Sequence, residues 1–178
     1  MACHQYARYS VGMPTNKSAG RHQEPHPGIE VDEAPLGSLL LQAVRAHAAL
    51  ATSLLAELGL AAPQEVVLLY LQDHGGVPQS ELVRFLGRDR STVTATLQTL
   101  ERAALVERTP SQTDRRAMDV DLTEAGRALC PRIRAAWAEL ERLAFEYVAP
   151  RQRAELTSAL GAVRDAARTH AAEKGAPS

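Results

Sequence analysis

The chain has few aromatic side chains, few cysteines and almost no net charge. Aromatic residues make up 4% of its 178 residues, and the two cysteines, Cys3 and Cys130, lie far apart in the sequence. Two such cysteines form neither a disulfide framework nor a metal-ligand spacing. No apolar run is expected to span a bilayer, and the first residues lack the apolar core of a secretory signal. We therefore expect a soluble, helix-rich cytoplasmic protein that does not bind a membrane.

The usual signatures of enzymes are also missing. The sequence has no Gly-rich phosphate loop, no nucleophile elbow and no metal-spaced set of His, Cys or Glu. His4, His22 and His26 are widely spaced in a segment rich in Pro, Gly and charge, which makes them poor metal ligands. We expect no catalytic residue, no cofactor and no metal.

The net charge of −1 hides a gradient along the chain. Residues 1–83 have a net charge of −4, and residues 117–178 are neutral. Residues 84–116 hold seven arginines against four acids, a net of +3. A local basic block attracts a polyanion whatever the total charge, although such a block is also common on solvated helices.

The order of the patterns predicts a mainly α-helical fold with a small β-hairpin. Residues 1–34 have no apolar period and are expected to form a flexible tail, as are the last residues, 171–178. A long helix over 36–59 follows, and then short helices over 64–72 and 81–86, the second capped by Ser80. A third helix begins at Ser91, two β-prone segments cover 105–109 and 118–122, and two further helices cover 123–148 and 151–170.

Two short helices joined by a tight turn and followed by a hairpin form a winged helix-turn-helix. In that arrangement the second helix lies in the DNA major groove and the hairpin reaches toward phosphates or the minor groove. Val93, Leu97 and Leu100 are expected to face the core. Ser91, Thr92, Thr94, Ala95 and Gln98 are then expected to face outward, where Ser, Thr and Gln can bond base edges. The alternative for this face is a helix cap at Ser91 followed by solvated side chains. Four threonines in one exposed helix run against helix propensity, which favours a functional surface.

Residues 81–129 resemble the core of the MarR family of bacterial transcription regulators. The resemblance rests on the ordered motifs GRDRSTVT, LERAALVERTP, DRRA and LTEAG, and it extends with lower specificity over residues 36–170. It implies a family domain over 35–170, with dimerisation helices at 36–59 and 123–170 and a DNA-binding lobe at 60–122. The implied partners are a second copy of the chain and double-stranded DNA with a pseudo-palindromic operator. A repressor released by a small effector is the implied function.

The resemblance also assigns residues to the DNA-binding site. Ser91, Thr92 and Thr94 match the start of the recognition helix, and Arg90, with Arg88 beside it, matches a phosphate contact. In the wing, Asp114 matches an acid that orients Arg116, and Arg115 lies at the tip, where an arginine can enter a narrow minor groove.

Three positions depart from the family pattern. Ala95 and Thr99 stand where the family often has arginine, so the wing, Arg88 and Arg90 are expected to supply more of the contact to phosphates. Ala104 stands where the turn before the first wing strand often has glycine, which is expected to make that turn less favourable.

Five residues are candidates for an effector pocket at the junction of the two parts. A mixed, mainly apolar pocket there would suit a small aromatic or phenolic ligand, with ordinary packing as the alternative for each residue. The five are Arg45, His47, Tyr70, His74 and Trp137.

Two other functions stay open. One is an oxidant-sensing regulator that uses Cys130 or Cys3, although a buried structural thiol is the better interpretation of Cys130. The other is a winged domain that binds proteins and has no specific affinity for DNA. Such a domain would show no salt-dependent DNA binding, whereas a regulator would.

Overall fold

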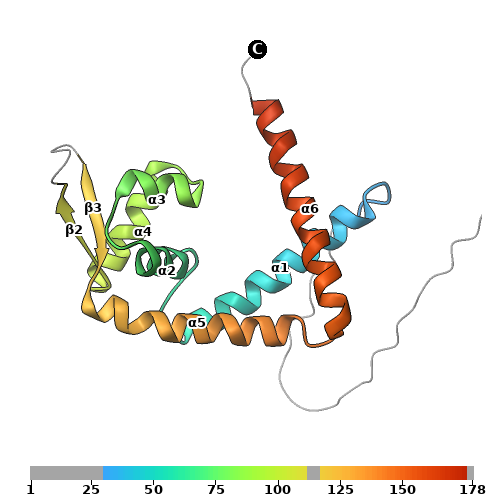
Figure 1. Ribbon diagram of the computed structural model, residues 1–178, viewed down its shortest axis with the longest axis horizontal. Helices are drawn as coiled ribbons and strands as arrows, with labels where there is room; N and C mark the ends of the chain where they lie inside the picture. Colours follow the sequence, from blue (N-terminus) through green and yellow to red (C-terminus); the bar gives the residue numbers. More distant parts are fainter. Residues whose placement is uncertain (1–29, 112–116, 176–178) are drawn as a thin grey trace, which may run out of the picture.

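The structure, a computed structural model, describes residues 30–111 and 117–175 (Figure 1). The N-terminal segment expected as a tail therefore lies almost wholly outside the described residues. The elements, in chain order, are α1 Pro35–Ala56, α2 Gln64–His74, β1 Val77–Pro78, α3 Gln79–Leu86, α4 Arg90–Arg102, β2 Val106–Pro110, β3 Met118–Leu122, α5 Glu124–Ala144 and α6 Pro150–Gly175.

The elements fall into a compact lobe and an extended helical part. Figure 1 shows α2, α3, α4 and the strands gathered at one end, α5 running away from them, and α6 rising from the far end of α5. The sheet order is β1-β3-β2, with antiparallel pairs throughout. This arrangement confirms the expected mainly α-helical winged helix-turn-helix fold.

The hydrophobic core lies in the lobe, at the end of α1 and in the first half of α5. The recognition-helix residues Val93, Leu97 and Leu100 are buried, as their spacing predicted. In β3 the alternation of MDVDL places Val120 and Leu122 in the core, and the intervening positions, Asp119 and Asp121, are half-buried. Other core residues are Val67, Leu68, Leu71, Leu82, Val106 and Ile133.

Some element boundaries differ from the sequence expectation. Ser80 does not cap α3, because the helix begins at Gln79, two residues before the expected start, and Pro78 occupies the cap position without a side-chain hydrogen bond. Between the helices expected over 64–72 and 81–86, where no strand was predicted, lies β1, which pairs with β3. Helix α5 passes through Pro131 and ends at Ala144, before the expected Val148. Helix α6 continues past the expected end at His170 to Gly175.

Helix α1 is more apolar than its neighbours in the chain. Among the described residues it is the one helix long and apolar enough to span a membrane, with a mean hydropathy of 1.4 over its window. This corrects the expectation that no apolar run reaches that length. Length and composition are weak evidence for a span, and the helix carries Arg45 near its middle.

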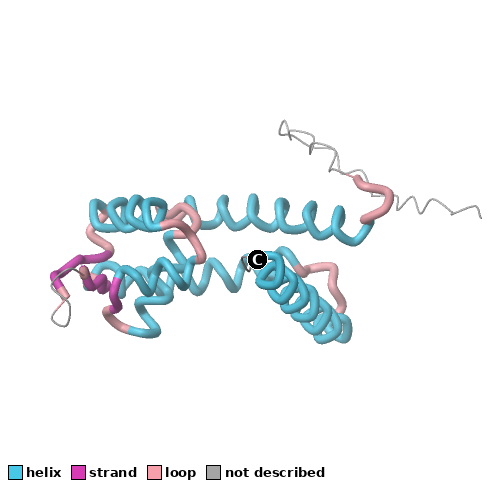
Figure 2. Tube along the Cα trace, turned by 90° about the horizontal axis from the view of Figure 1, so that it is seen from above, coloured by secondary structure: helices cyan, strands magenta, loops and turns pink. Residues whose placement is uncertain are grey.

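The apolar side chains of α1 are mostly uncovered in the single chain. Its exposed large residues are Leu36, Leu39, Leu40, Leu41 and Val44, and α6 adds Leu160 and Val163. Helix α1 packs along α5, and the view from above shows α1 and α5 running beside each other while α6 projects to one side (Figure 2). The helical part thus leaves an apolar surface without a partner inside the chain.

Candidate nucleic-acid interface

The start of α4 is organised by one carboxylate that the sequence analysis did not single out. Asp89 is the N-cap of α4, and its side chain accepts hydrogen bonds from Thr92 N at 2.9 Å, from Thr92 Oγ1 at 2.7 Å and from Ser91 Oγ. These bonds, that from Ser91 first, hold the pKa of Asp89 well below its usual range. Ser91 is therefore not the cap. The preference for Asp at N-caps was the available signal.

Two arginines flank this cap and are open to solvent. Gly87 ends α3 in the left-handed conformation, at φ 57°. The short turn that follows places Arg88 next to the N-terminus of α4, and Arg90 is the first residue of that helix. Both side chains are exposed, and neither forms an ion pair with the described residues. Arg108, in contrast, is paired with Glu101. Arg88 and Arg90 thus keep their charge available for an anionic partner.

The outward face of α4 carries the other predicted DNA-binding residues. Gln98, Ala95, Ser91 and Thr92 are exposed, as expected. Thr94 is half-buried instead, and its hydroxyl accepts a hydrogen bond from Gln79 Nε2 at 2.8 Å. The recognition helix and the first residue of α3 are therefore linked by their side chains.

The wing is joined to α4 at its base. Strands β2 and β3 pair from Val106 opposite Leu122 to Pro110 opposite Met118, so the hairpin extends over five residue pairs. The ion pair between Arg108 and Glu101 ties β2 to the last turn of α4. The predicted tip residues Asp114, Arg115 and Arg116 lie outside the described residues, and their assignment remains a prediction.

The base of the wing also depends on an unusual turn. Ala104 has a φ of 55°, a left-handed conformation that glycine adopts without strain and other residues do not, which explains the expected less favourable turn. Thr123 stabilises the turn, because its hydroxyl donates to Ala104 O at 2.7 Å and accepts from Gly126 N at 3.0 Å. Thr123 is thereby also the N-cap of α5.

The five predicted effector-pocket residues lie in different surroundings. Tyr70 stacks on His74 with ring centroids 4.1 Å apart and donates a hydrogen bond to Glu81 of α3 at 2.6 Å. His47 lines an open groove of about 560 Å³ between α1, the end of α5 and α6. Arg45 is exposed.

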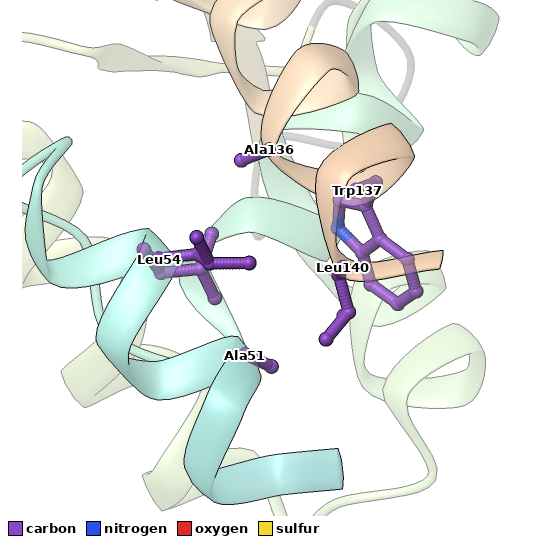
Figure 3. Close-up of a pocket in the computed structure, with 6 residues that line it drawn as sticks. Ala51, Leu54, Ala136, Trp137 and Leu140 are labelled. Carbon is purple, nitrogen blue, oxygen red and sulfur yellow. The ribbon is translucent and has the colours of Figure 1, made fainter. Parts of the chain in front are cut away.

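Trp137 lies in a separate, much smaller hollow. Figure 3 shows its ring beside Leu140 of α5, across from Ala51 and Leu54 of α1. The cavity volume there is about 10 Å³, room for little more than a water molecule. In this conformation the hollow does not admit an aromatic ligand.

Cys130 is held in the core. Its Sγ lies 3.3 Å from Gly126 O and 3.7 Å from Leu68 O, and 2% of the residue is exposed. Burial raises the pKa of the thiol, which lowers the fraction of reactive thiolate. This supports the interpretation of Cys130 as a structural thiol. Cys3, the other candidate oxidant sensor, lies outside the described residues.

Comparison with known proteins identifies the family. The family model described as MarR family matches residues 58–117. The HTH-type transcriptional repressor NicR of Pseudomonas putida is 35% identical over 94 residues, which span 53% of this chain and 60% of NicR, less than two thirds of its length. The HTH-type transcriptional repressor Rv2887 of Mycobacterium tuberculosis is 34% identical over 126 residues, which span 68% of this chain and 88% of that protein.

Solved structures agree with the sequence matches. A MarR mutant from E. coli complexed with operator DNA superposes with a TM-score of 0.68 at 26% identity, covering 74% of this chain and 95% of that one. BpsR of Bordetella bronchiseptica, whose DNA binding is described as regulated by 6-hydroxynicotinic acid, has a TM-score of 0.68 at 27% identity, covering 78% and 99%. With a helix-turn-helix, a wing and a relative matched over most of its length, this chain belongs to the MarR family.

Proposed function

We propose that the chain is a sequence-specific, double-stranded DNA-binding transcription regulator. The main observation behind this proposal lies at the N-terminus of α4. There Arg88 and Arg90 are exposed and form no ion pair with the described residues. Unpaired arginines beside a helix of groove-reading geometry supply phosphate contacts, and the exposed polar face of α4 can meet base edges. The operator complex of the E. coli MarR mutant supports the same role for this lobe.

The DNA-binding assignment predicts how affinity changes with charge. Replacing Arg115 and Arg116 by Ala, or Arg88 and Arg90 by Ala, should weaken binding to all sequences. Each pair should flatten the slope of log affinity against log salt by up to about 2, because each phosphate contact contributes roughly 0.9. Fluorescence anisotropy with the upstream region of the protein's own gene, at several salt concentrations, measures this slope.

A matched variant separates local contacts from total charge. Arg168→Ala with Lys174→Ala removes the same charge from exposed positions on α6, which Figure 1 places far from α4. Its salt slope should equal that of the wild type. An unchanged slope in the Arg115 and Arg116 variant contradicts the wing assignment. No salt-dependent binding in the wild type would favour a winged module that binds proteins instead.

A second copy of the chain is the proposed partner of α1 and α6. The exposed apolar residues of both helices border the groove of about 560 Å³ at His47. Leaving such an apolar surface in water is unfavourable, so a second copy that covers it would stabilise the protein. A symmetric dimer would also place two copies of α4 for the two halves of a pseudo-palindrome. Sedimentation equilibrium should therefore give twice the mass of the chain.

A small aromatic effector is the proposed releasing signal, by analogy with BpsR and 6-hydroxynicotinic acid. We place its site along α1, at the groove lined by His47 or next to Trp137, in a conformation more open than the one described. A ligand that shifts the lobes away from half-site spacing would release DNA. Trp137 is the single tryptophan of the chain, so its fluorescence reports a ligand bound beside it.

A further inference from the structure

The hydroxyl protons of the recognition helix are bound within the protein. Helix α4 contains one serine and four threonines, and every one of these hydroxyls donates its proton to an acceptor within the same turn of the chain. Thr94 Oγ1 donates to Arg90 O at 2.8 Å, Thr96 Oγ1 to Thr92 O at 3.0 Å and Thr99 Oγ1 to Ala95 O at 3.0 Å. Ser91 and Thr92 both donate to the carboxylate of Asp89.

Two of these hydroxyls also accept a hydrogen bond, that of Thr99 from Arg102 in the same helix and that of Thr94 from Gln79 of α3. Thr94 is therefore the one that is tied to a neighbouring helix. A hydroxyl has one proton and two lone pairs, and at Thr94 the proton is donated to Arg90 O while one lone pair accepts from Gln79 Nε2 at 2.8 Å. In a helix a threonine divides between two χ1 rotamers. The bond from Gln79 adds a second constraint on the hydroxyl and so favours one of them. The group of Thr94 that makes no hydrogen bond is its methyl.

This arrangement limits which base edges α4 can read. Guanine presents only acceptors, N7 and O6, in the major groove, and thymine presents a methyl group beside one acceptor. A hydroxyl whose proton is already donated cannot also donate to guanine unless an internal bond breaks. Methyl groups, however, are available on this face, because Ala95 is exposed next to Thr94.

We propose that Thr94 reads thymine through its methyl group, in contact with the 5-methyl group of the base, and that Gln79 is the positioning residue that holds Thr94 in that rotamer. The inference rests on the proposed DNA-binding function and specifies its chemistry. It makes Thr94 a specificity-determining residue of apolar type. Threonine hydroxyls were expected to bond base edges, and this assignment replaces that expectation at Thr94.

Replacing thymine by uracil in the DNA tests the contact directly, because uracil lacks only the 5-methyl group. The binding site is first selected from random DNA with the full chain, and each thymine of a half-site is then replaced by uracil. Loss of one buried methyl contact should lower affinity about fourfold at one thymine of each half-site. The other thymines should show no such change.

Two variants of Thr94 separate its methyl from its hydroxyl. Thr94→Val keeps a methyl and removes the hydroxyl, so it should retain the preference for thymine over uracil. Thr94→Ser keeps the hydroxyl and removes the methyl, so it should bind the two DNAs equally. Thr96→Ser makes the same chemical change two residues away and should leave the ratio at the wild-type value.

Gln79→Ala tests the positioning role through the same ratio. It should reduce the preference for thymine over uracil, whereas a residue that only stabilised the fold would lower both affinities equally. Thermal melting of each variant shows that α4 is folded.

The outcomes distinguish this inference from the function on which it rests. A specific complex that tolerates uracil at every thymine overturns the methyl contact and leaves the regulator assignment intact. The methyl contact is also overturned if Thr94→Val loses the thymine preference and Thr94→Ser keeps it, because the hydroxyl then reads the base. Failure to select any sequence, with no salt-dependent binding, refutes the proposed function itself.

Discussion

Adding one methyl group at Gly126 should strongly destabilise the lobe. It lies in the first turn of α5 and is buried against the turn that leads into β2. A Cβ at this position would lie 2.1 Å from Leu105 O and 3.1 Å from both Leu105 C and Leu122 Cδ2. The nearest atom belongs to the backbone, so no side-chain rotation relieves the overlap. Gly126→Ala requires α5 to move away from the wing by about 1 Å, since such contacts are otherwise beyond 3.0 Å.

The size of the effect follows from opposing contributions. Moving α5 strains the bond from Thr123 N to Leu105 O, now 3.1 Å long. Overpacking costs about 1–3 kcal/mol and a lost hydrogen bond about 1 kcal/mol. Alanine favours the helix over glycine by about 1 kcal/mol. The net loss is about 1–3 kcal/mol, which lowers Tm by roughly 3–10 °C for a chain of this size.

Differential scanning calorimetry at one protein concentration measures the change in Tm. Gly161→Ala is the control, because it makes the same substitution inside α6, where a Cβ would meet nothing within 4 Å. It should raise Tm by about 2–4 °C from helix propensity alone, because about 1 kcal/mol is gained. If Gly126→Ala melts at or above the wild-type temperature, the wing and α5 tolerate the extra Cβ, and the overlap with Leu105 O does not destabilise the lobe.

Ala104→Gly should stabilise the chain by about 1 kcal/mol, because Ala104 holds a left-handed φ of 55° that costs an L-residue roughly 1–2 kcal/mol and glycine much less. Urea unfolding of this variant should show a higher midpoint, and Ala103→Gly, one residue earlier at a φ of −79°, should show a lower one. Glu65→Gln should change the pH dependence of stability. Burial raises the pKa of Glu65, and its Oε2 has no hydrogen-bond partner among the described residues. The folded wild type therefore holds a proton that the unfolded chain releases near pH 4, and its stability falls as the pH rises from there through the raised pKa. The variant should not lose stability over this pH range, which urea midpoints measured from pH 4 to pH 8 would show. Parallel curves for the two proteins would show that Glu65 ionises normally in the folded state.

Local patterns in the sequence predicted most of the fold. The spacing of Val93, Leu97 and Leu100 identified the buried face of α4, and the alternation in Met118–Leu122 identified β3. Both succeed because the period of a helix or strand is set by backbone geometry within a few residues. At Ala104 the family resemblance predicted only a less favourable turn, and the left-handed φ that explains it came from the structure.

The candidate site was predicted less completely. Arg90, together with Arg88, was assigned to phosphate contacts from the family resemblance, and that role remains a prediction. The role of Asp89 was missed, although its cap position was readable from the residues around it. The link from Gln79 to Thr94 spans 15 residues and depends on how α3 crosses α4, which no local pattern specifies.

The sequence by itself determined the order of helices and strands, the basic block and the motifs of a winged helix-turn-helix, because these depend on neighbours in the chain. Only the tertiary structure showed that Gly126 lies against the carbonyl of Leu105, 21 residues earlier, and that Glu65 is buried. It also showed that Tyr70 and His74 stack beside α3 and that Trp137 faces α1. These are contacts between elements. They are set by how surfaces pack at close range, and packing depends on the shapes of all the side chains that meet there.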